Sequence, residues 1–374
     1  MNRHALLVSA VTALFGSTLA TAQPIAQGIT EPRVFAPFDP AAHSCTPPPG
    51  LKKSLAFAQD NTRDFMQGVS RGLAAAATDR GLAYEVALAD NDAAKMAEQV
   101  QRLGALALGG IVAAPVDAVG LAPHLQKLIL AGTYVGTVVP PPAVSLLNAP
   151  QYLTGKVLAD AAAAYIGEKL KGKARVVLLT HDSLQFLAPR FVAMRDVLNS
   201  LPGVTIVADI SPQTVDKAGG EAMMQNILLA HPDVDVVLGA DTVVLGALAA
   251  VRAAGKERPD QFFGGIDGEP EAIAQIKTGS TYKASISLAS PVFGYAMGQH
   301  AADWLEGKSI PQAMDVLPFA LNSANMAAYE ADMADPGQVY RDPIRRHQYL
   351  RFYGNICYDT RDQYVNFPWS SERK

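Results

Sequence analysis

Two aspartates lie where a parallel sheet would bind a polar ligand. Asp241 follows the short apolar run 234–238, and Asp267 follows a second apolar run, 262–266. Between them, apolar residues recur at helical spacing over 244–251. The segment therefore predicts strand, helix and strand, with Asp241 as the N-cap of the helix. Open α/β sheets bind ligands at the carboxyl ends of their strands. Carboxylates at that edge would accept hydrogen bonds from a small polar molecule.

The sequence offers no comparable signal for catalysis, a cofactor or a metal. G-x-G-x-x-G, P-loop and G-x-S-x-G motifs are absent, and the two cysteines and seven histidines show no metal-ligand spacing. The net charge of −4 gives no basic surface for nucleic acid. A Pro-rich segment ahead of residue 53 excludes a helix-turn-helix there. We therefore expect a binding protein that is not an enzyme and that carries no metal and no cofactor.

Apolar runs and helical patterns alternate along most of the 374 residues, a length that suggests about two domains. Asp117 and Thr154 stand at predicted helix starts, and the proline-containing stretch 139–153 interrupts the alternation. Alternating strands and helices with short turns imply parallel sheets with right-handed crossovers. We therefore predict two Rossmann-like lobes. The expected strands are 53–59, 84–89, 110–114, 134–138, 175–180, 204–209, 234–238 and 262–266.

The two ends of the chain have the character of an exported protein. Residues 1–22 combine a polar start, an apolar core and the small-residue site Ala20-Thr21-Ala22, which indicates a signal peptide cleaved after Ala22. A frayed amphipathic helix is the alternative. Residues 23–50 form a Pro-rich arm. Cys45 and Cys357 are an even pair in the mature part and invite a disulfide, with two free thiols as the alternative.

From Lys53 to about Leu305 the sequence resembles the type I periplasmic binding proteins of the ribose and sugar-binding subfamily. The matching pieces occur in the family's order: AFAQDNTRDFMQGVSRG, NDAAK, AAPVDAVGLAP, HPDVDVVLGADTVVLGAL and GGIDGEPEAIAQIKTG. The resemblance implies an α/β fold of two Rossmann-like lobes joined by a three-strand hinge, here with N- and C-terminal extensions. It divides the chain into lobe 1 (51–148 plus 292–317), lobe 2 (149–291 plus 318–330) and an extension at 331–374.

The same resemblance implies a periplasmic monomer that captures a small polar ligand, a sugar or a polyol, and delivers it to an ABC permease in the inner membrane. Docking on a chemoreceptor or a receptor kinase, or binding of a non-sugar metabolite, remains an alternative. The residues that the resemblance places at or near the site are Gln59, Asp60, Arg63, Phe65, Arg190, Asp241 and Asp267. Two candidates come from their position alone: His181 ends a predicted second-lobe strand, and Ser287 lies close to the second hinge.

Structural roles compete with binding at each of these positions. Phe65 shares a helix face with core residues, and Asp241 and Asp267 could serve only as a cap and a turn residue. The first-turn residues and Arg190 could be ordinary exposed groups. His181, with Asp182, could form a plain turn.

Three departures from the family pattern concern the ligand. Val139-Pro140 stands where the family carries an Asp-Arg pair, Ala240 replaces an Asn, and Leu288 stands near a hinge Gln. The 331–374 extension interleaves Tyr, Trp and Arg, which in isolation suggests a nucleic-acid or partner surface. In an exported chain the same pattern fits a segment wrapped over the lobes and pinned by Cys357 to Cys45.

Overall fold

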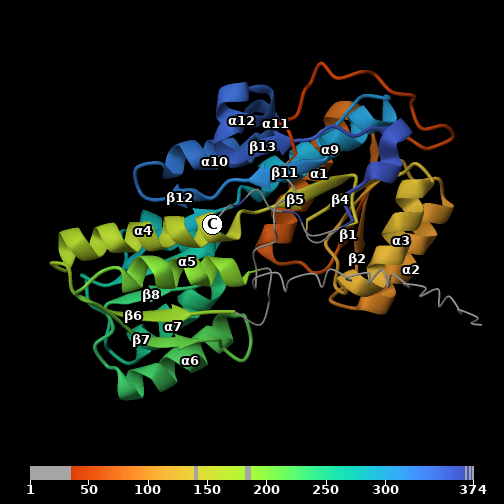
Figure 1. Ribbon diagram of the computed structural model, residues 1–374. Helices are drawn as coiled ribbons and strands as arrows, with labels where there is room; N and C mark the ends of the chain where they lie inside the picture. Colours follow the sequence, from red (N-terminus) through yellow and green to blue (C-terminus); the bar gives the residue numbers. More distant parts are fainter. Residues whose placement is uncertain (1–34, 139–141, 182–186, 367–368, 370–371, 373–374) are drawn as a thin grey trace, which may run out of the picture.

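The computed structural model describes residues 35–138, 142–181, 187–366, 369 and 372. The predicted signal peptide, residues 23–34 of the arm, Val139-Pro140 and Asp182 lie outside the described residues. The described chain forms two sheets with helices packed against them, arranged as two lobes side by side (Figure 1).

The first lobe contains a seven-stranded sheet of order β13-β11-β5-β4-β3-β1-β2. Its neighbouring strands run parallel, except that β13 pairs antiparallel with β11. The helix pairs α1/α9 and α2/α3 pack against this sheet. The strands are β1 (Ser54–Gln59), β2 (Ala83–Leu88), β3 (Gly110–Ala113), β4 (Tyr134–Thr137), β5 (Ser145–Asn148), β11 (Ala313–Val316) and β13 (Leu350–Tyr353). The helices are α1 (Asp64–Arg80), α2 (Ala93–Ala105), α3 (Ala118–Leu130) and α9 (Ser290–Leu305).

The second lobe contains a six-stranded sheet of order β12-β10-β9-β8-β6-β7. Its strands run parallel, except that β12 pairs antiparallel with β10. The helix pairs α4/α5 and α6/α7 belong to this lobe, with α8 between β9 and β10. Its strands are β6 (Ala174–Leu179), β7 (Val204–Ile210), β8 (Val236–Leu238), β9 (Phe262–Asp267), β10 (Tyr282–Ser287) and β12 (Phe319–Leu321). Its helices are α4 (Gln151–Lys169), α5 (Ala188–Asn199), α6 (Lys217–Ala230), α7 (Asp241–Ala253) and α8 (Pro270–Lys277).

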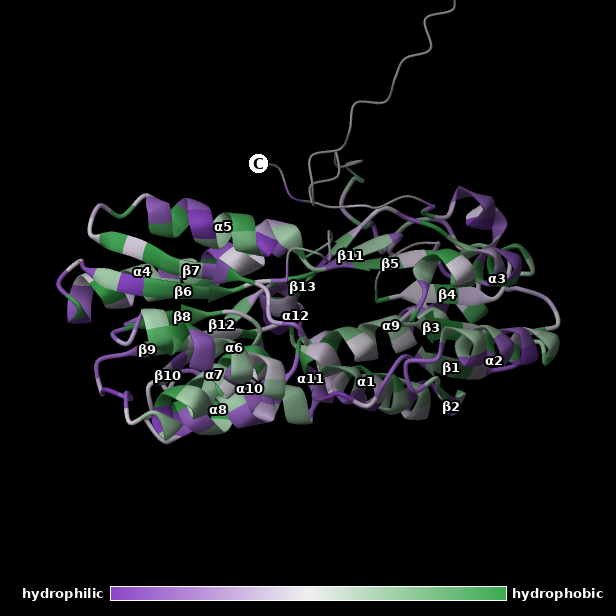
Figure 2. Cartoon of the chain, turned by 90° about the horizontal axis from the view of Figure 1, so that it is seen from below, coloured by the Kyte–Doolittle hydropathy of each residue, from purple (hydrophilic) through white to green (hydrophobic). Residues whose placement is uncertain are grey.

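The central strands are continuous apolar runs because helices cover the sheet on both sides. Residues 55–58 of β1 and 176–178 of β6 are fully buried, and β6 is hydrophobic along most of its length in Figure 2. Parallel strands buried on both faces are expected to show such runs instead of alternation. The buried strands fix where each carboxyl end, and hence each polar turn, can lie.

The chain passes between the sheets at four places: from β5 to α4, from β10 to α9, from β11 to β12, and from β12 back to β13 through the C-terminal segment. At the second passage Ala289 has a left-handed backbone, with φ of 46°. Beyond it, α9 packs so closely on α1 that a Cβ at Gly72 would lie 2.1 Å from the carbonyl oxygen of Pro291. Glycine is therefore required where α1 meets the start of α9.

The C-terminal extension crosses back from the second lobe to the first. From here on the name covers the chain from the start of α10, five residues before the boundary expected at 331. The extension comprises α10 (Met326–Ala334), α11 (Pro336–Arg341), α12 (Pro343–Tyr349), β13 and a short 3-10 helix, Tyr358–Gln363. Glu330 of α10 pairs with Lys277 of α8 at 2.8 Å, and Tyr340 of α11 packs on Tyr295 of α9 with ring centroids 5.5 Å apart. Figure 2 shows α10 and α11 between the helices of the two lobes.

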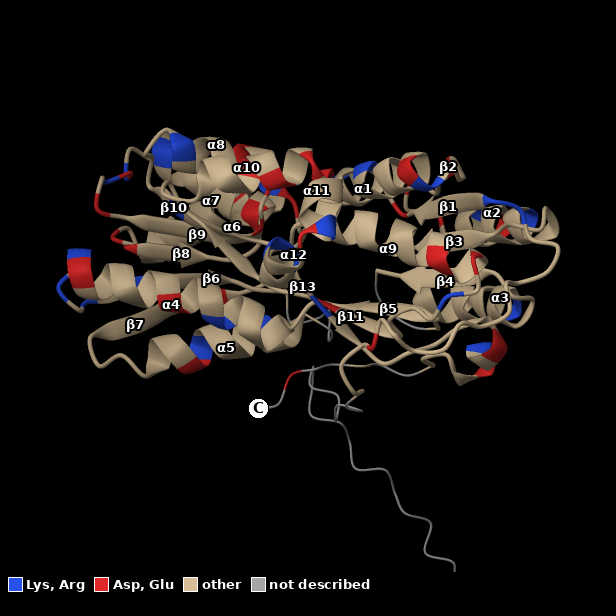
Figure 3. Ribbon diagram, turned by 90° about the horizontal axis from the view of Figure 1, so that it is seen from above, with Lys and Arg blue, Asp and Glu red and all other residues tan. Residues whose placement is uncertain are grey.

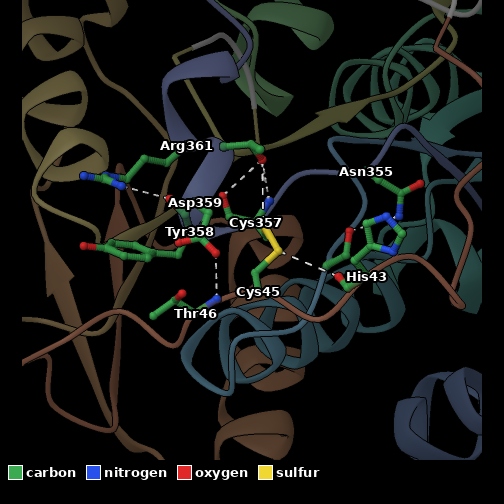
Figure 4. The surroundings of a disulfide bond; sticks show 10 residues. His43, Cys45, Thr46, Asn355, Cys357, Tyr358, Asp359 and Arg361 are labelled. Atoms are coloured by element: carbon green, nitrogen blue, oxygen red, sulfur yellow. Dashed lines mark hydrogen bonds between the residues drawn. A yellow bond between two sulfur atoms is a disulfide. The ribbon is translucent and has the colours of Figure 1, made fainter.

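The end of the extension is joined to the N-terminal arm. Cys45 and Cys357 form a disulfide across 312 residues of sequence, and Asp359 accepts a hydrogen bond from the backbone of Thr46 at 2.7 Å (Figure 4). Pro37 makes an antiparallel bridge to Tyr353 of β13. The arm therefore covers the free edge of the first sheet, a common protection of exposed edges.

Most predicted elements are present, with two corrections. Thr154 is not an N-cap: α4 begins at Gln151, and the Thr154 hydroxyl donates to the carbonyl of Pro150 within the first turn, at 2.6 Å. The interval 139–153, expected to be only a passage, contains β5, since its short run Ser145–Asn148 was obscured by the surrounding prolines. Among the described helices, none combines the length and apolarity needed to cross a bilayer.

Candidate ligand-binding site

Asp267 ends β9 in a strained conformation at the edge where the sequence places a ligand. It is half-buried, and its φ of 122° is a region that residues with a side chain rarely adopt. Such strain costs on the order of 1–3 kcal/mol and persists at functional sites held by their surroundings. Gly268 follows with φ of 69°, and its backbone amide donates to Ser285 Oγ at 3.1 Å. The turn 267–269, here named the Asp267 turn, is thus fixed against β10.

Asp241 holds the Asp267 turn through a hydrogen bond from the Glu269 amide. Its fully buried carboxylate accepts hydrogen bonds from Tyr282 and Ser285 hydroxyls, both at 2.6 Å, and from the Glu269 amide at 2.9 Å. The prediction that it caps α7 is wrong, because Ala240 is the N-cap and Asp241 is the first helical residue. Burial raises the pKa of Asp241 to about 6 despite the three donors.

Charges from both lobes act on the Asp267 turn. Burial raises the pKa of Asp267, and Arg190 of the second lobe and Arg63 of the first partly oppose that rise. Burial also raises the pKa of Glu269 to about 8, with further contributions from Asp241, Asp267 and, across the lobes, Asp64. The charges of Arg63 and Asp64, at the start of α1, therefore reach the turn from the other lobe. A carboxylate of one lobe and a guanidinium of the other can bind the same small molecule.

Arg190 is held in place by a residue of a neighbouring helix. Arg190 is only 5% exposed, and its guanidinium donates through Nε and one terminal nitrogen to Gln151 Oε1, at 2.8 and 2.5 Å. Burial lowers its pKa, and the charge of Asp267 opposes that change. An arginine presented by a fixed partner loses little rotamer freedom when it binds a ligand.

The first-lobe turn after β1 is a network of hydrogen bonds among its own residues. Gln59 Nε2 donates to the carbonyl of Asn61 at 2.5 Å, and Asp60 pairs with Arg63 at 2.8 Å. Asn61 donates from its side chain to Asn91 Oδ1 at 2.9 Å. Arg63 remains half exposed in this pair, so its guanidinium keeps donors for another acceptor.

Comparisons with known proteins identify the family of this chain. A family model described as a periplasmic binding protein domain matches residues 55–309. The chain belongs to this family. The ribose import binding protein RbsB of Bacillus subtilis is 26% identical over 261 residues, covering 67% of this chain and 80% of that protein. A putative rhizopine-binding protein of Rhizobium meliloti is 28% identical over 266 residues, covering 67% and 83%.

Solved periplasmic binding proteins share the fold. The Caulobacter myo-inositol binding protein bound to myo-inositol superposes with a TM-score of 0.62 at 25% identity, covering 74% of this chain and 94% of that one. A periplasmic ribose ABC transporter structure from Conexibacter woesei gives 0.66 at 20% identity, covering 75% and 95%. The predicted family, the two-lobed α/β fold and the interpretation as a solute-binding protein are thus confirmed.

Within this periplasmic binding protein, the structure brings some predicted residues together and leaves others apart. The charges of Arg190 and Arg63 both act on Asp267, and Asp60 pairs with Arg63. Phe65 is half-buried and packs on Phe293 of α9 with centroids 5.7 Å apart. Asp241 and Gln59 direct their bonds into the protein. His181 is half-buried, two residues beyond the end of β6.

Ser287 is engaged by the C-terminal extension. Its hydroxyl meets the Tyr329 hydroxyl of α10 at 2.5 Å and accepts a hydrogen bond from the Ala289 amide at 2.9 Å. Sequence reasoning missed Tyr329, since it lies beyond the segment that matches the family. It also missed Glu269, Tyr282, Ser285 and Gln151, which support or border the predicted residues.

No metal-binding constellation competes with this interpretation among the described residues. One group of side chains of the metal-ligating type lies close together, Cys45, Cys357 and Asp359. Both cysteines belong to the disulfide, so neither offers a thiolate.

In the view of Figure 3, acidic and basic residues are interspersed over both lobes.

Proposed function

We propose that this protein captures a sugar or polyol between its two lobes and delivers it to an ABC importer. The observation that carries the proposal is that Arg63 and Asp64, at the start of α1 in the first lobe, act electrostatically on the carboxyl groups of the Asp267 turn in the second. The relatives and solved neighbours of this family are named for ribose and myo-inositol, which supports the ligand class.

A polyhydroxylated ring fits the groups at this site. Each hydroxyl is both donor and acceptor, so it can donate to the Asp267 carboxylate and accept from Arg63 or Arg190. Phe65 offers an apolar face for the C–H side of the ring. A ligand that contacts both lobes favours the closed arrangement by its differential affinity, and this closure is the mechanism that we propose.

Two apolar positions make the site less polar than that of the family pattern. Ala240 caps α7, where the family carries an amide, and Leu288 is buried beside Ser287. These positions favour a ligand with fewer hydroxyls than a hexose. A non-sugar metabolite is therefore the second candidate class.

The remaining parts of the proposal concern location and processing. We propose removal of residues 1–22 during export, a periplasmic monomer with a Cys45–Cys357 disulfide, and lobes 51–148 plus 292–317 and 149–291 plus 318–330. The expected results are a mature N-terminus at Gln23 and no free thiol in the unfolded, unreduced protein. Two free thiols would contradict the disulfide.

The primary test is a thermal-shift screen of the mature protein against sugars, polyols, and small aromatic and apolar metabolites. A ligand at a hundred times its dissociation constant adds about 2.7 kcal/mol, which raises the midpoint by several degrees. A hit among sugars or polyols supports the proposal. A hit only among the other compounds would replace the ligand class, and no hit in any class would count against the proposed function.

Substitution at Asp267 tests the site itself. Asp267→Asn keeps the shape but removes the charged acceptor, so we expect at least about 2 kcal/mol of lost binding, roughly 30-fold in Kd. Asp209→Asn is the control, because Asp209 is exposed on β7, where it pairs with Arg195. Equal affinity of the two variants in calorimetry would remove Asp267 from the site.

A further inference from the structure

A tyrosine of the C-terminal extension reaches the strand beside the ligand-binding turn. Tyr329 of α10 is buried, and its hydroxyl lies 2.5 Å from Ser287 Oγ. Its ring stacks on Phe319 of β12, with centroids 6.2 Å apart and planes inclined by 14°. Two independent contacts therefore fix the position of the Tyr329 hydroxyl.

Ser287 connects that hydroxyl to the Asp267 turn. In the sheet, Ser287 is the cross-strand partner of Asp267 on one side and of Phe319 on the other. A Cβ built at Gly268 would lie 2.8 Å from both Cβ and Oγ of Ser287, so the backbone of the turn rests directly on this side chain. Any rotation of Ser287 about χ1 would alter the support of the turn.

We infer that Tyr329 is a positioning residue of the ligand site: by holding Ser287, it keeps the Asp267 turn in its binding conformation. The strained φ of Asp267 needs such support, because a strained backbone relaxes unless its neighbours prevent it. The effect on ligand affinity rests on the proposed function, while the effect on the turn itself does not.

The extension supplies a matched control. Tyr349 is also buried, and its hydroxyl donates to Asp332 at 2.7 Å. Its ring also packs on Phe319, with centroids 5.3 Å apart. Removal of either hydroxyl leaves the aromatic packing in place and deletes one buried hydrogen bond, but the bond to Ser287 is lost in the Tyr329 variant and kept in the Tyr349 variant.

The deciding experiment measures hydrogen exchange of the Gly268 and Glu269 amides in the ligand-free wild type, Tyr329→Phe and Tyr349→Phe proteins. These amides donate to Ser285 and Asp241 and so report the state of the turn. We expect these amides to exchange about 10-fold faster in Tyr329→Phe than in the wild type or in Tyr349→Phe, because only Tyr329→Phe loses the hydrogen bond that supports the turn. The amides of β1 serve as an internal standard. Unchanged exchange at the turn, or an equal increase at β1, would overturn the inference.

A second measurement uses D-ribose and myo-inositol as probes. For the probe that the wild type binds, Tyr329→Phe should weaken affinity about 5- to 10-fold and Tyr349→Phe should not. The effect should also be absent when Ser287→Ala is already present, because the two residues act through one contact. If the wild type binds neither probe nor any sugar, the proposed function fails, while the exchange experiment still decides the role of Tyr329.

Discussion

Replacing Asp241 by asparagine should remove one contribution to the pH dependence of stability, about 3 kcal/mol between roughly pH 4 and pH 7. Asp241 is fully buried and meets three donors, yet burial raises its pKa from 3.8 to about 6. Since the folded pKa lies above the unfolded one, the folded state holds this proton more tightly. The resulting stability is fully present below about pH 4 and is lost as pH rises through 6.

The magnitude follows from the shift. A change from 3.8 to about 6, at 1.36 kcal/mol per pH unit, amounts to about 3 kcal/mol. The side chain of the Asp241→Asn variant carries no charge at any pH, and its amide can still accept from Ser285 and the Glu269 backbone. The unfolding free energy of the variant should therefore fall about 3 kcal/mol less than that of the wild type between about pH 4 and pH 7.

Urea unfolding followed by circular dichroism over that pH range measures both curves. Asp117→Asn is the control, because Asp117 caps α3 through the Val119 and Gly120 amides and asparagine caps a helix equally well. Parallel curves for wild type and Asp241→Asn would refute the assignment of a buried, reluctantly ionised carboxyl to this position.

Three further predictions concern packing and cross-links. Gly72→Ala should destabilise the protein by about 1–3 kcal/mol in chemical unfolding, since the added Cβ would lie 2.1 Å from the Pro291 carbonyl oxygen. Gly167→Ala is the control: the added Cβ meets no described atom within 4 Å, so this variant should be as stable as the wild type or more stable. Replacing both Cys45 and Cys357 by alanine should lower the unfolding free energy by up to about 6 kcal/mol for a 312-residue separation, and an unchanged urea midpoint would contradict this. Gln151→Ala should leave the Arg190 guanidinium without this acceptor and cost about 2 kcal/mol of stability, measured in the same assay.

The alternation of apolar runs and helical patterns predicted much of the fold. A run such as Phe262–Ile266 is legible because parallel strands buried on both faces leave an uninterrupted apolar signature. Asp117 was recognised as a cap from its position, and the structure bears this out with two backbone amides. Strand β5 escaped detection because four residues between prolines carry too little periodicity to reveal a strand.

The site was less accessible to sequence reasoning, because its supporting contacts join residues far apart in the chain. Nothing local to Asp241 indicates that Tyr282 and Ser285 occupy its carboxylate, 41 and 44 residues away. The positive φ of Asp267 is likewise invisible in the letters Asp-Gly, which are typical of ordinary turns. Tyr329 lies in a segment outside the family resemblance, so no motif could indicate it.

The order of strands in the first sheet has a consequence for how the chain assembles. One edge of that sheet is β2, from the first hundred residues, and the other edge is β13 at Leu350–Tyr353. The second sheet takes β6 to β10 from one contiguous stretch and needs only β12 from later in the chain. The second lobe can therefore organise while the C-terminal residues are still being made.

The lobe that begins first must consequently finish last. Until residues 350–357 are available, β11 lacks its outer partner and Cys45 lacks Cys357, so the first sheet has an unprotected edge at β11. Contacts of such long sequence separation form slowly. A chain shortened before β13 should keep an ordered second lobe but lose the protected edge of the first sheet. The last segment to be synthesised is therefore the one that completes the first lobe.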